Sequence, residues 1–452
     1  MAKYKRYPEY KDSGVEWLDD IPEHWNLSKI SWNFKAEKGK NGQLLTKEYC
    51  GSKTGEYPVY SGQTENDGIM GRIDTYEFDS GENGVLFSTT VGAKAMHLSH
   101  LKGKFSLSQN CMIIMPLSAL NVRYCYYHFQ PLFAHERGLI PDHMQASFRM
   151  EDLYQYKVIL PPFPEQKLIA RFLDHETGKI DRLIQKQQQL IELLKEKRQA
   201  VISHAVTKGL NPNAPLKPSN IEWLGDVPEH WEVKKLKHII HTLESGVSVN
   251  AADTPAMGND LGVLKTSCVY TRSFRATENK TVLKGEENRV KCRTRKGAII
   301  ISRMNTPELV GASAVVDSDH PNIYLPDRLW QTVFESNVKI NSTFIAHFMT
   351  IMGFRKQISL AAEGASSSMQ NIAKEDYLSI NVLLPSLDEQ NSIVNGLATQ
   401  LRALDSLNEN AIVTSTLLQE RRTALISAAV TGKIDVRDWQ PPTEGKSEEE
   451  KG

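Results

Sequence analysis

The chain of 452 residues lacks any long apolar run. A helix that spans a bilayer needs roughly 18 or more consecutive apolar residues, and no such stretch occurs. The first ten residues are polar and aromatic, without the apolar segment of a secretory signal. The sequence therefore predicts no membrane segment, and the expected location is the cytoplasm.

Cysteine is scarce, and net charge is absent. The five cysteines are scattered, with no CxxC and no Cys and His pair at the spacing of metal ligands, so we interpret them as reduced thiols. The 54 basic and 54 acidic residues cancel, which excludes a strong global field that attracts nucleic acid. Any anionic partner must therefore bind to local basic patches.

Catalytic signatures are also missing. The sequence contains no Asn-Pro-Pro-aromatic tetrad of adenine methyltransferases, no HExxH and no GxxxxGK[ST] loop, since Gln440 stands where the first glycine before Gly445-Lys-Ser is required. His97 and His100 have no further metal ligands in the sequence around them. We therefore expect a chain that is not an enzyme by itself and holds no metal or cofactor.

Self-similarity is the strongest signal that is present. Residues 13–25 (SGVEWLDDIPEHW) return at 219–231 (SNIEWLGDVPEHW), 206 residues later, with nine of thirteen positions identical. Residues 160–166 (LPPFPEQ) return at 384–390 (LPSLDEQ), 224 residues later, so the second variable region is 18 residues longer than the first. Two similar frames around two different inserts suit one task performed on two targets.

A long helix is predicted after each second motif. Glu165 and Glu389 place an acidic residue in the first helical turn, and Gly209 and Gly432 suit left-handed C-caps. These bounds predict helices of about 40 residues, roughly 60 Å long at 1.5 Å per residue.

Apolar residues recur in both helices at the seven-residue interval of a two-stranded coiled coil. We expect the two helices to pair antiparallel, because both lie on one chain, which creates an internal pseudo-two-fold axis. Pairing between two chains is the alternative. The predicted seam, which is also a candidate surface for partners, consists of Leu173, Ile180, Leu183, Leu190, Leu194, Val201, Leu397, Leu404, Leu407, Leu418 and Leu425.

The regions between the repeats show short apolar runs broken by Gly, Asn and Asp, which predict mixed domains with several strands. Val85–Phe87 and Ala298–Ile301 are the clearest buried strands. Each is followed by polar residues that form either loops presented to a DNA groove or ordinary turns.

A basic segment, RVKCRTRK at 289–296, is the clearest electrostatic signal. On a strand, its alternating cations share one face about 7 Å apart and suit the phosphates of a DNA strand. A solvated edge strand is the alternative. Residues 57–68 offer aromatic and amide groups as a weaker candidate. The candidate DNA-binding residues are Arg289, Lys291, Arg293, Arg295, Lys296, Arg303, Asn305, Tyr60, Gln63, Asn66, Ser88, Thr89, Thr90 and Lys94.

The layout, with the motifs Trp-Leu-x-x-hydrophobic-Pro-x-His-Trp, Leu-Pro-x-x-x-x-Glu-Gln and Ala-Val-Thr, resembles the specificity subunits of type I restriction-modification systems. The resemblance covers nearly the whole chain. It implies an α+β protein in which two target-recognition domains, joined by two long helices, read the halves of an asymmetric double-stranded DNA site. It also implies that the helices bind two methyltransferase subunits, which recruit motor-nuclease subunits, and that S-adenosylmethionine, ATP and Mg²⁺ belong to those partners.

Two other functions stay open. A non-DNA coiled-coil scaffold has no need of paired variable domains, and a self-contained restriction or methylation enzyme needs motifs that are missing.

The sequence predicts a division of the chain into seven parts. The parts are 1–25 (first motif), 26–160 (first recognition domain), 161–210 (first helix), 211–231 (linker and second motif), 232–384 (second recognition domain), 385–435 (second helix) and 436–452 (acidic disordered tail).

Overall fold

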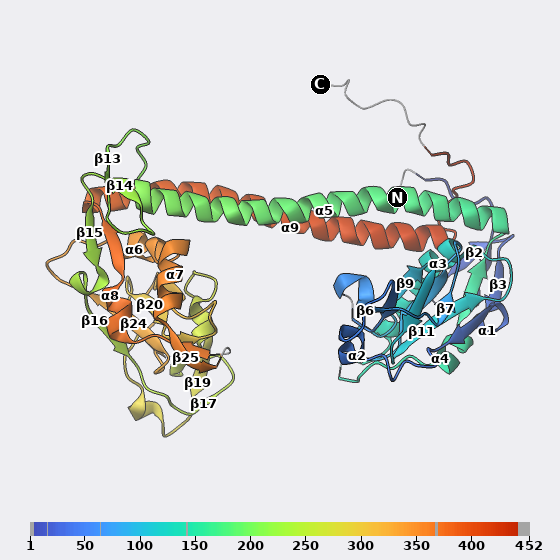
Figure 1. Ribbon diagram of the computed structural model, residues 1–452, viewed down its shortest axis with the longest axis horizontal. Coiled ribbons are helices and arrows are strands. Elements are labelled where there is room, and N and C mark those ends of the chain that lie inside the picture. Colours follow the sequence, from blue (N-terminus) through green and yellow to red (C-terminus); the bar gives the residue numbers. More distant parts are fainter. Residues whose placement is uncertain (1–3, 16, 64, 142, 367–368, 442–452) are drawn as a thin grey trace. The chain divides into compact units, whose positions relative to one another are not determined.

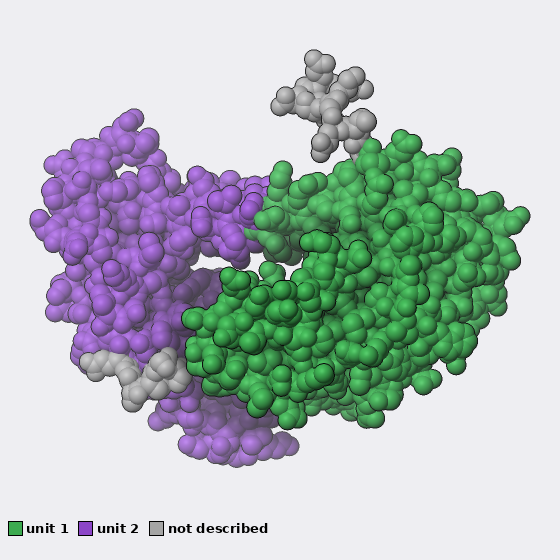
Figure 2. Space-filling view, turned by 45° about the vertical axis from the view of Figure 1, so that its right-hand side comes forward, with its two compact units in different colours: residues 1–188, 412–452 green, residues 189–411 purple. Residues whose placement is uncertain are grey.

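A computed structural model describes the chain except for residues 1–3, 16, 64, 142, 367–368 and 442–452. It divides into two compact units, which Figure 2 colours separately: unit 1 holds residues 1–188 and 412–452, and unit 2 holds residues 189–411. Most of the predicted acidic tail lies outside the described residues. We call residues 26–160 the first variable domain and residues 232–384 the second variable domain.

Short strands and helices precede the first long helix (Figure 1). In chain order they are β1 (Tyr10–Asp12), β2 (Asp20–Pro22), β3 (Asn26–Lys29), α1 (Ile30–Asn33), β4 (Phe34–Glu37), α2 (Lys47–Gly51), β5 (Tyr57–Tyr60), η1 (Glu65–Gly68), β6 (Ile69–Ile73), β7 (Phe78–Asp79), β8 (Val85–Thr89), β9 (Leu98–Leu101), β10 (Lys104–Leu107), β11 (Cys111–Pro116), α3 (Val122–Gly138), α4 (Met150–Gln155), β12 (Lys157–Leu160) and α5 (Phe163–Lys208).

The second repeat carries a similar series with more short strands. It comprises β13 (Leu216–Pro218), β14 (Asp226–Pro228), β15 (Glu232–Lys235), η2 (Leu236–His238), β16 (Ile240–Ser245), β17 (Ala251–Ala252), β18 (Gly262–Leu264), η3 (Thr266–Val269), β19 (Asn279–Val282), η4 (Glu287–Arg289), β20 (Ile299–Ser302), β21 (Met304–Asn305), β22 (Ser313–Val315), β23 (Ile323–Tyr324), β24 (Leu329–Phe334), α6 (Ser342–Phe348), α7 (Met352–Ala361), β25 (Glu363–Ser366), β26 (Met369–Asn371), α8 (Lys374–Ser379), β27 (Asn381–Leu384) and α9 (Leu387–Val430).

Both variable domains contain two four-stranded sheets. In the first, the antiparallel sheet has the order β4-β11-β8-β9, and a mixed sheet has the order β6-β5-β10-β7 with β5 and β10 parallel. In the second, the orders are β16-β24-β20-β22 and β17-β19-β18-β23, again with one parallel pair, β18 and β23. Two related α+β domains are thus built from sequences that differ.

The ends of each variable domain meet in a two-stranded antiparallel sheet. Asn26 of β3 pairs with Leu160 of β12, and Glu232 of β15 pairs with Leu384 of β27. Each domain therefore leaves and rejoins the repeated frame at one place. This explains the two repeat offsets, because 18 extra residues between β15 and β27 leave the frame unchanged.

The two long helices pack against each other in both units, antiparallel as predicted. In unit 1, Leu173 of α5 and Ile426 of α9 share one core. In unit 2, Ile202 of α5 lies in one core with Ile393 and Leu397 of α9. Apolar side chains on α5 and α9 thus form a seam, and its best buried parts adjoin the variable domains.

The predicted seam residues differ in burial along the helices. Leu173, Ile180 and Leu397 are buried. Leu183, Leu190 and Leu407 are exposed, at 47%, 42% and 54% respectively. The heptad pattern therefore marks the helices correctly, but it does not say which of its leucines are covered. The remaining predicted positions are half-buried: Leu194, Val201, Leu404, Leu418 and Leu425.

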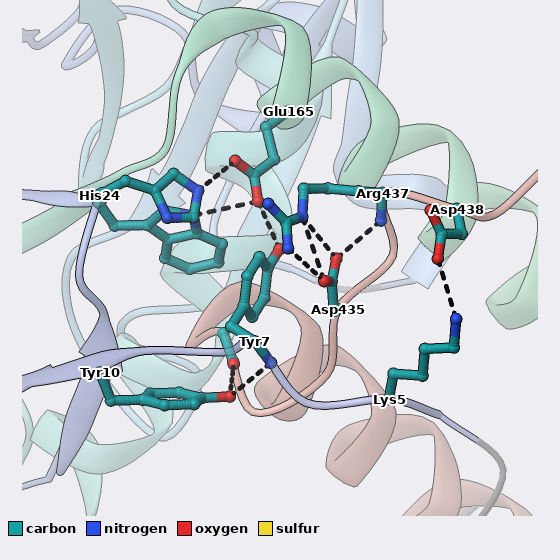
Figure 3. Close-up of polar contacts among 10 residues, drawn as sticks. Lys5, Tyr7, Tyr10, His24, Glu165, Asp435, Arg437 and Asp438 are labelled. Atoms are coloured by element: carbon teal, nitrogen blue, oxygen red, sulfur yellow. Dashed lines mark hydrogen bonds and ion pairs between the residues drawn. The ribbon is translucent and has the colours of Figure 1, made fainter.

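In each unit, the glutamate at the start of the long helix contacts the motif that precedes the variable domain; Glu165 is buried and Glu389 is half-buried. In unit 1 the Glu165 carboxylate accepts hydrogen bonds from Trp25 Nε1 at 3.1 Å and from the Tyr7 hydroxyl, and lies 2.9 Å from His24 Nε2 (Figure 3). In unit 2 the equivalent Glu389 lies 2.9 Å from His230 Nε2. The acidic residues that the sequence marks as helix starts therefore also fasten each helix to the motif of its own unit.

The neighbouring glutamine ties the helix to the variable domain. Gln166 Oε1 accepts from the backbone N–H of Asn121 at 3.0 Å, and Gln390 Oε1 accepts from that of Asn341 at 2.8 Å. These asparagines are the N-caps of α3 and α6. The Glu-Gln pair thus joins three parts of each repeat, which accounts for its presence in both copies.

Glycines follow the ends of both long helices in the left-handed conformation, as predicted for C-caps. Gly209 has φ 78° and Gly432 has φ 76°. A Cβ on Gly432 would lie 2.3 Å from Pro22 Cδ and 3.2 Å from Trp25, and one on Gly209 would lie 3.3 Å from Trp231. Each glycine therefore allows the helix end to approach a motif tryptophan closely.

Candidate DNA interface

Three predicted contact residues of the first variable domain are buried. Ser88 and Thr89 continue strand β8 and are 0% and 1% exposed, and Thr90 is 2% exposed. The backbone N–H of Thr90 donates to the carbonyl of Asn110 at 2.8 Å. Ser88, Thr89 and Thr90 are therefore core residues of the described structure, and their prediction as a loop facing a groove is wrong, because the strand continues past the apolar run.

Three of the other four candidates of this domain lie in or beside the turn between β5 and β6. Tyr60 packs its ring against Phe87 and Phe105, which leaves it half-buried. Gln63 and Asn66 are exposed, and both donate a side-chain N–H to the carbonyl of Ile69, at 2.8 Å and 3.2 Å. Lys94 is exposed on a different loop, after β8. Gln63, Asn66 and Lys94 thus remain accessible to a ligand.

The basic segment 289–296 is not the continuous strand that its alternation suggests. Arg289 ends the short helix η4 and pairs with Glu286. Cys292 has φ 59°, which interrupts an extended chain, and Arg293 forms only an isolated bridge, with Tyr324. The prediction of one strand is therefore wrong for this segment, since a left-handed residue divides it.

Several cations of this segment nevertheless point to solvent. Lys291, Arg293, Arg295 and Lys296 are exposed, and Thr294 between them is buried. Arg295 pairs with Glu244, which neutralises part of the predicted row. Lys291, Arg293 and Lys296 form no ion pair within the described part of the chain, so their charges are available to an anionic ligand.

Arg303 directly follows β20, Asn305 lies in β21, and both are half-buried. Asn305 Nδ2 donates to the Tyr270 hydroxyl at 2.8 Å and to Ser302 Oγ at 3.2 Å. The strand that precedes them was predicted correctly, because its run of isoleucines is completely buried. The structure thus connects this predicted polar stretch to Tyr270, which the sequence did not single out.

A polar groove of about 460 Å³ lies on the second variable domain beside β17 and β18. Three cations, Lys265, Lys280 and Arg328, line it together with one acidic residue, Asp327, and with uncharged polar and apolar residues. Both lysines contact Asp253, at 3.3 Å and 3.0 Å, and these contacts lower the pKa of the Asp253 carboxyl. Sequence reasoning missed this groove because its cations are dispersed along the chain.

The part of the chain that the structure describes contains neither a candidate metal site nor a candidate membrane-spanning helix. No group of three or more His, Cys, Asp or Glu side chains is arranged to hold a metal ion. None of its helices is long and apolar enough to cross a membrane. The five cysteines are free, and burial raises the pKa of Cys111, Cys125, Cys268 and Cys292.

Known proteins share both the sequence pattern and the fold. The chain is 26% identical over 431 residues to the type I restriction enzyme MjaVIII specificity subunit of Methanocaldococcus jannaschii, covering 92% of this chain and 95% of that subunit. It is 23% identical over 285 residues to the EcoKI specificity subunit of Escherichia coli K12, covering 62% of this chain and 58% of that subunit. A chain in a solved type I R-M complex superposes with a TM-score of 0.64, at 12% identity, over 91% of this chain and 98% of that one.

A family model described as the type I restriction modification DNA specificity domain matches the sequence twice. The matches cover residues 22–193 and 228–413, and each contains one variable domain and the first part of the helix that follows it. The repeat, the two related domains and the paired helices agree with this assignment. The chain therefore belongs to the type I restriction-modification specificity subunits, the non-catalytic chains that give these systems their DNA sequence specificity.

Proposed function

We propose that the chain reads an asymmetric DNA site in two parts, one with each variable domain. The observation that carries this proposal is the closure of both domains by paired strands, β3 with β12 and β15 with β27, on equivalent parts of a repeated frame. The frame is the same twice, whereas the enclosed sequences and lengths differ. Two different readers on one kind of frame favour two different half-sites.

The chemistry of reading is the ordinary chemistry of protein–DNA contact. Exposed cations such as Lys94, Lys291 and Arg293 neutralise phosphates and hold the domains on the duplex, which makes binding dependent on salt. Amide side chains such as Gln63 and Asn66 suit adenine, whose N6 and N7 offer a donor and an acceptor. Phosphate contacts set the position, and base contacts set the sequence.

We further propose that the two long helices bind two methyltransferase subunits, which bring in motor-nuclease subunits. Leu193 on α5 and Leu417 on α9 are equivalent positions 224 residues apart, and they are 60% and 58% exposed. Leu183 and Leu407 form a second such pair, at 47% and 54%. The same apolar side chain is thus exposed at equivalent positions of both helices. This repetition suits the binding of two copies of one partner. S-adenosylmethionine, ATP and Mg²⁺ would be bound by those partner subunits and not by this chain. The complex would work in the cytoplasm, where the DNA is.

Methylation mapping of host DNA tests the proposal. Adenine methylation is determined with the complete system, without this chain, and with residues 26–160 replaced by another first variable domain. Methylation should require the chain, and the exchange should change one half of the methylated motif. The matched control exchanges residues 232–384, which should change only the other half. If either exchange altered both halves, the division of the site between the domains would be wrong.

A further inference from the structure

In each variable domain, a short segment follows the second strand of the parallel pair and leads into the antiparallel sheet. Residues 108–110 connect β10 to β11 in the first domain, and residues 325–328 connect β23 to β24 in the second. We call these two segments the crossovers. Strands hold both ends of each crossover, so its side chains project from a rigid support, as a precise binding site requires.

The strand register shows that the two crossovers are equivalent. Cys111, the first residue of β11, pairs with the last residue of β8. Leu329, the first residue of β24, pairs with the last residue of β20. The residue that precedes β11 is Asn110, and the residue that precedes β24 is Arg328. Asn110 and Arg328 therefore occupy matching positions in domains whose sequences differ.

The same backbone hydrogen bonds hold both crossovers. The N–H of Thr90 donates to the carbonyl of Asn110 at 2.8 Å, and the N–H of Arg303 donates to the carbonyl of Arg328 at 3.1 Å. In both domains the carbonyl of that donor residue accepts a further backbone N–H, at 2.7 Å and 3.1 Å. The backbone arrangement is thus repeated, whereas the side chains that it presents are different.

Both crossovers lie at the end of a central strand that is remote from the repeated frame. The other end of β11, Pro116, pairs with Phe34, which follows β3 and α1 directly. The other end of β24, Phe334, pairs with Ile240, which follows β15 and η2. Because β3 and β15 close the domains on the frame, the frame adjoins these other ends and leaves the crossovers accessible.

The first crossover presents two amide side chains, since Gln109 and Asn110 are both exposed. An amide offers a donor and an acceptor, which match N7 and N6 of adenine in the major groove. The N–H of Gln109 donates to the carbonyl of Gly42 at 2.8 Å, which brings the loop with the exposed Lys40 alongside. Lys94 is exposed on the loop that follows β8. Cations on both neighbouring loops suit the phosphates that flank a base.

The second crossover presents a guanidinium. Arg328 is exposed, and with the half-buried Asp327 it lines the groove of about 460 Å³ that also contains two lysines. The N–H of Leu325 donates to the carbonyl of Cys292 at 3.0 Å, so this crossover adjoins the basic segment 289–296. Arginine donates two hydrogen bonds to O6 and N7 of guanine, and a carboxylate accepts from N4 of cytosine, the paired base.

We propose that the crossovers read bases: Gln109 and Asn110 contact an adenine in the half-site of the first domain, and Arg328 contacts a guanine in the half-site of the second. This inference rests on the proposed DNA reading by both domains. It accounts for two specificities on one backbone arrangement, because the repeated hydrogen bonds set the position of each crossover and its side chains set the base.

Discrimination between base pairs tests the assignment. The chain, assembled with its methyltransferase subunits, is titrated with a duplex that contains its mapped motif, with duplexes in which one recognised base pair at a time is changed, and with an unrelated duplex. Gln109→Ala and Asn110→Gly should each reduce discrimination about tenfold at one A·T pair of the first half-site. Arg328→Ala should do so at one G·C pair of the second half-site.

Asn83→Ala and Arg275→Gln are the matched controls. Asn83 is an exposed amide near the other end of β8, and Arg275 is an exposed arginine that pairs with Glu278 at 3.7 Å. Neither control should change discrimination at any base pair. Glycine tolerates the φ of 67° at Asn110, so Asn110→Gly should melt near the wild-type temperature, which separates a lost contact from a misfolded domain.

Unchanged discrimination in all three crossover variants would refute the inference, as would a relaxed base pair of the other kind or in the other half-site. Equal weakening of Arg328→Ala on the motif and the unrelated duplex, with a salt slope less steep by about one, would identify a phosphate contact and refute the base assignment. These results would leave the reading by two domains intact. A wild-type complex that fails to bind its motif would instead refute the proposed function and this inference with it.

Discussion

The guanidinium of Arg422 donates to the carboxylate of Asp181 at 2.8 Å, which joins α9 to α5 within unit 1. Unit 2 holds the equivalent pair with the helices exchanged, because Arg198 of α5 donates to Asp405 of α9 at 3.0 Å. Each residue stands 224 positions from its counterpart. One ion pair is therefore encoded twice, and it aligns the same two turns of the helices in both units.

Exchanging the two charges of one ion pair should restore the thermal stability that each single substitution removes. Asp181→Arg places two cations together and should lower the melting temperature of the chain, and adding Arg422→Asp should recover most of the loss. The coupling should be about 0.5 kcal/mol, because both side chains are partly exposed. A thermal shift series of the two single variants and the double variant measures it. Additive losses in the double variant would show that the pair contributes nothing.

Acid should destabilise the first variable domain through His128. This side chain is fully buried, and its Nε2 accepts the backbone N–H of Ile159 at 3.2 Å. Burial lowers the pKa of His128 to about 3. Because an unfolded histidine has a pKa of about 6.5, the unfolded chain binds the proton first as pH falls. The contribution of this group is complete above pH about 6.5 and is lost between about 6.5 and 3, by at most about 1.4 kcal/mol per pH unit.

His128→Gln keeps a hydrogen-bond acceptor without a titrating group, and should therefore flatten the stability profile over that pH range. Urea unfolding, followed at several pH values between about 4 and 7, gives the comparison. His204→Gln, at an exposed position of α5, is the control. An unchanged slope in the His128 variant would assign the acid sensitivity to other groups.

Alanine at the helix ends should separate backbone strain from steric conflict. Gly209→Ala introduces a left-handed alanine, at a cost of about 1–2 kcal/mol, with its Cβ 3.3 Å from Trp231. Gly432→Ala bears the same backbone cost and also places its Cβ 2.3 Å from Pro22. We expect the Gly432 variant to melt at the lower temperature of the two. Equal melting temperatures would mean that the segment around Pro22 moves aside freely.

The exposed leucines of the long helices should determine how many methyltransferase subunits bind. Leu193→Glu and Leu417→Glu are each expected to reduce the complex from two such subunits to one, and the double variant should bind none. Native mass spectrometry of the assembled complex gives the count. Leu139→Glu is the matched control, since Leu139 is 66% exposed and caps the end of α3 rather than lying on a long helix. If both single variants still bound two subunits, these leucines would lie outside the interface.

The frame could be predicted from sequence because its contacts are made by repeated residues. Glu165 and Glu389 were visible as members of duplicated motifs, and their histidine partners belong to the other duplicated motif. The long helices follow from local rules, namely the heptad period and a terminal glycine. Both kinds of signal are contained in short stretches of chain, so no knowledge of the folded protein was needed to identify them.

The candidate interface was decided by tertiary structure. Ser88 is a polar residue of the kind that is common in loops, but it lies in a buried strand. Its burial depends on other segments that cover this strand. The sequence around Arg295 gives no sign of an acidic partner, but in the folded chain Arg295 forms an ion pair with Glu244. The sequence thus determined the repeated frame, whereas the fold determined which charges remain uncompensated, because compensation depends on neighbours far apart along the chain.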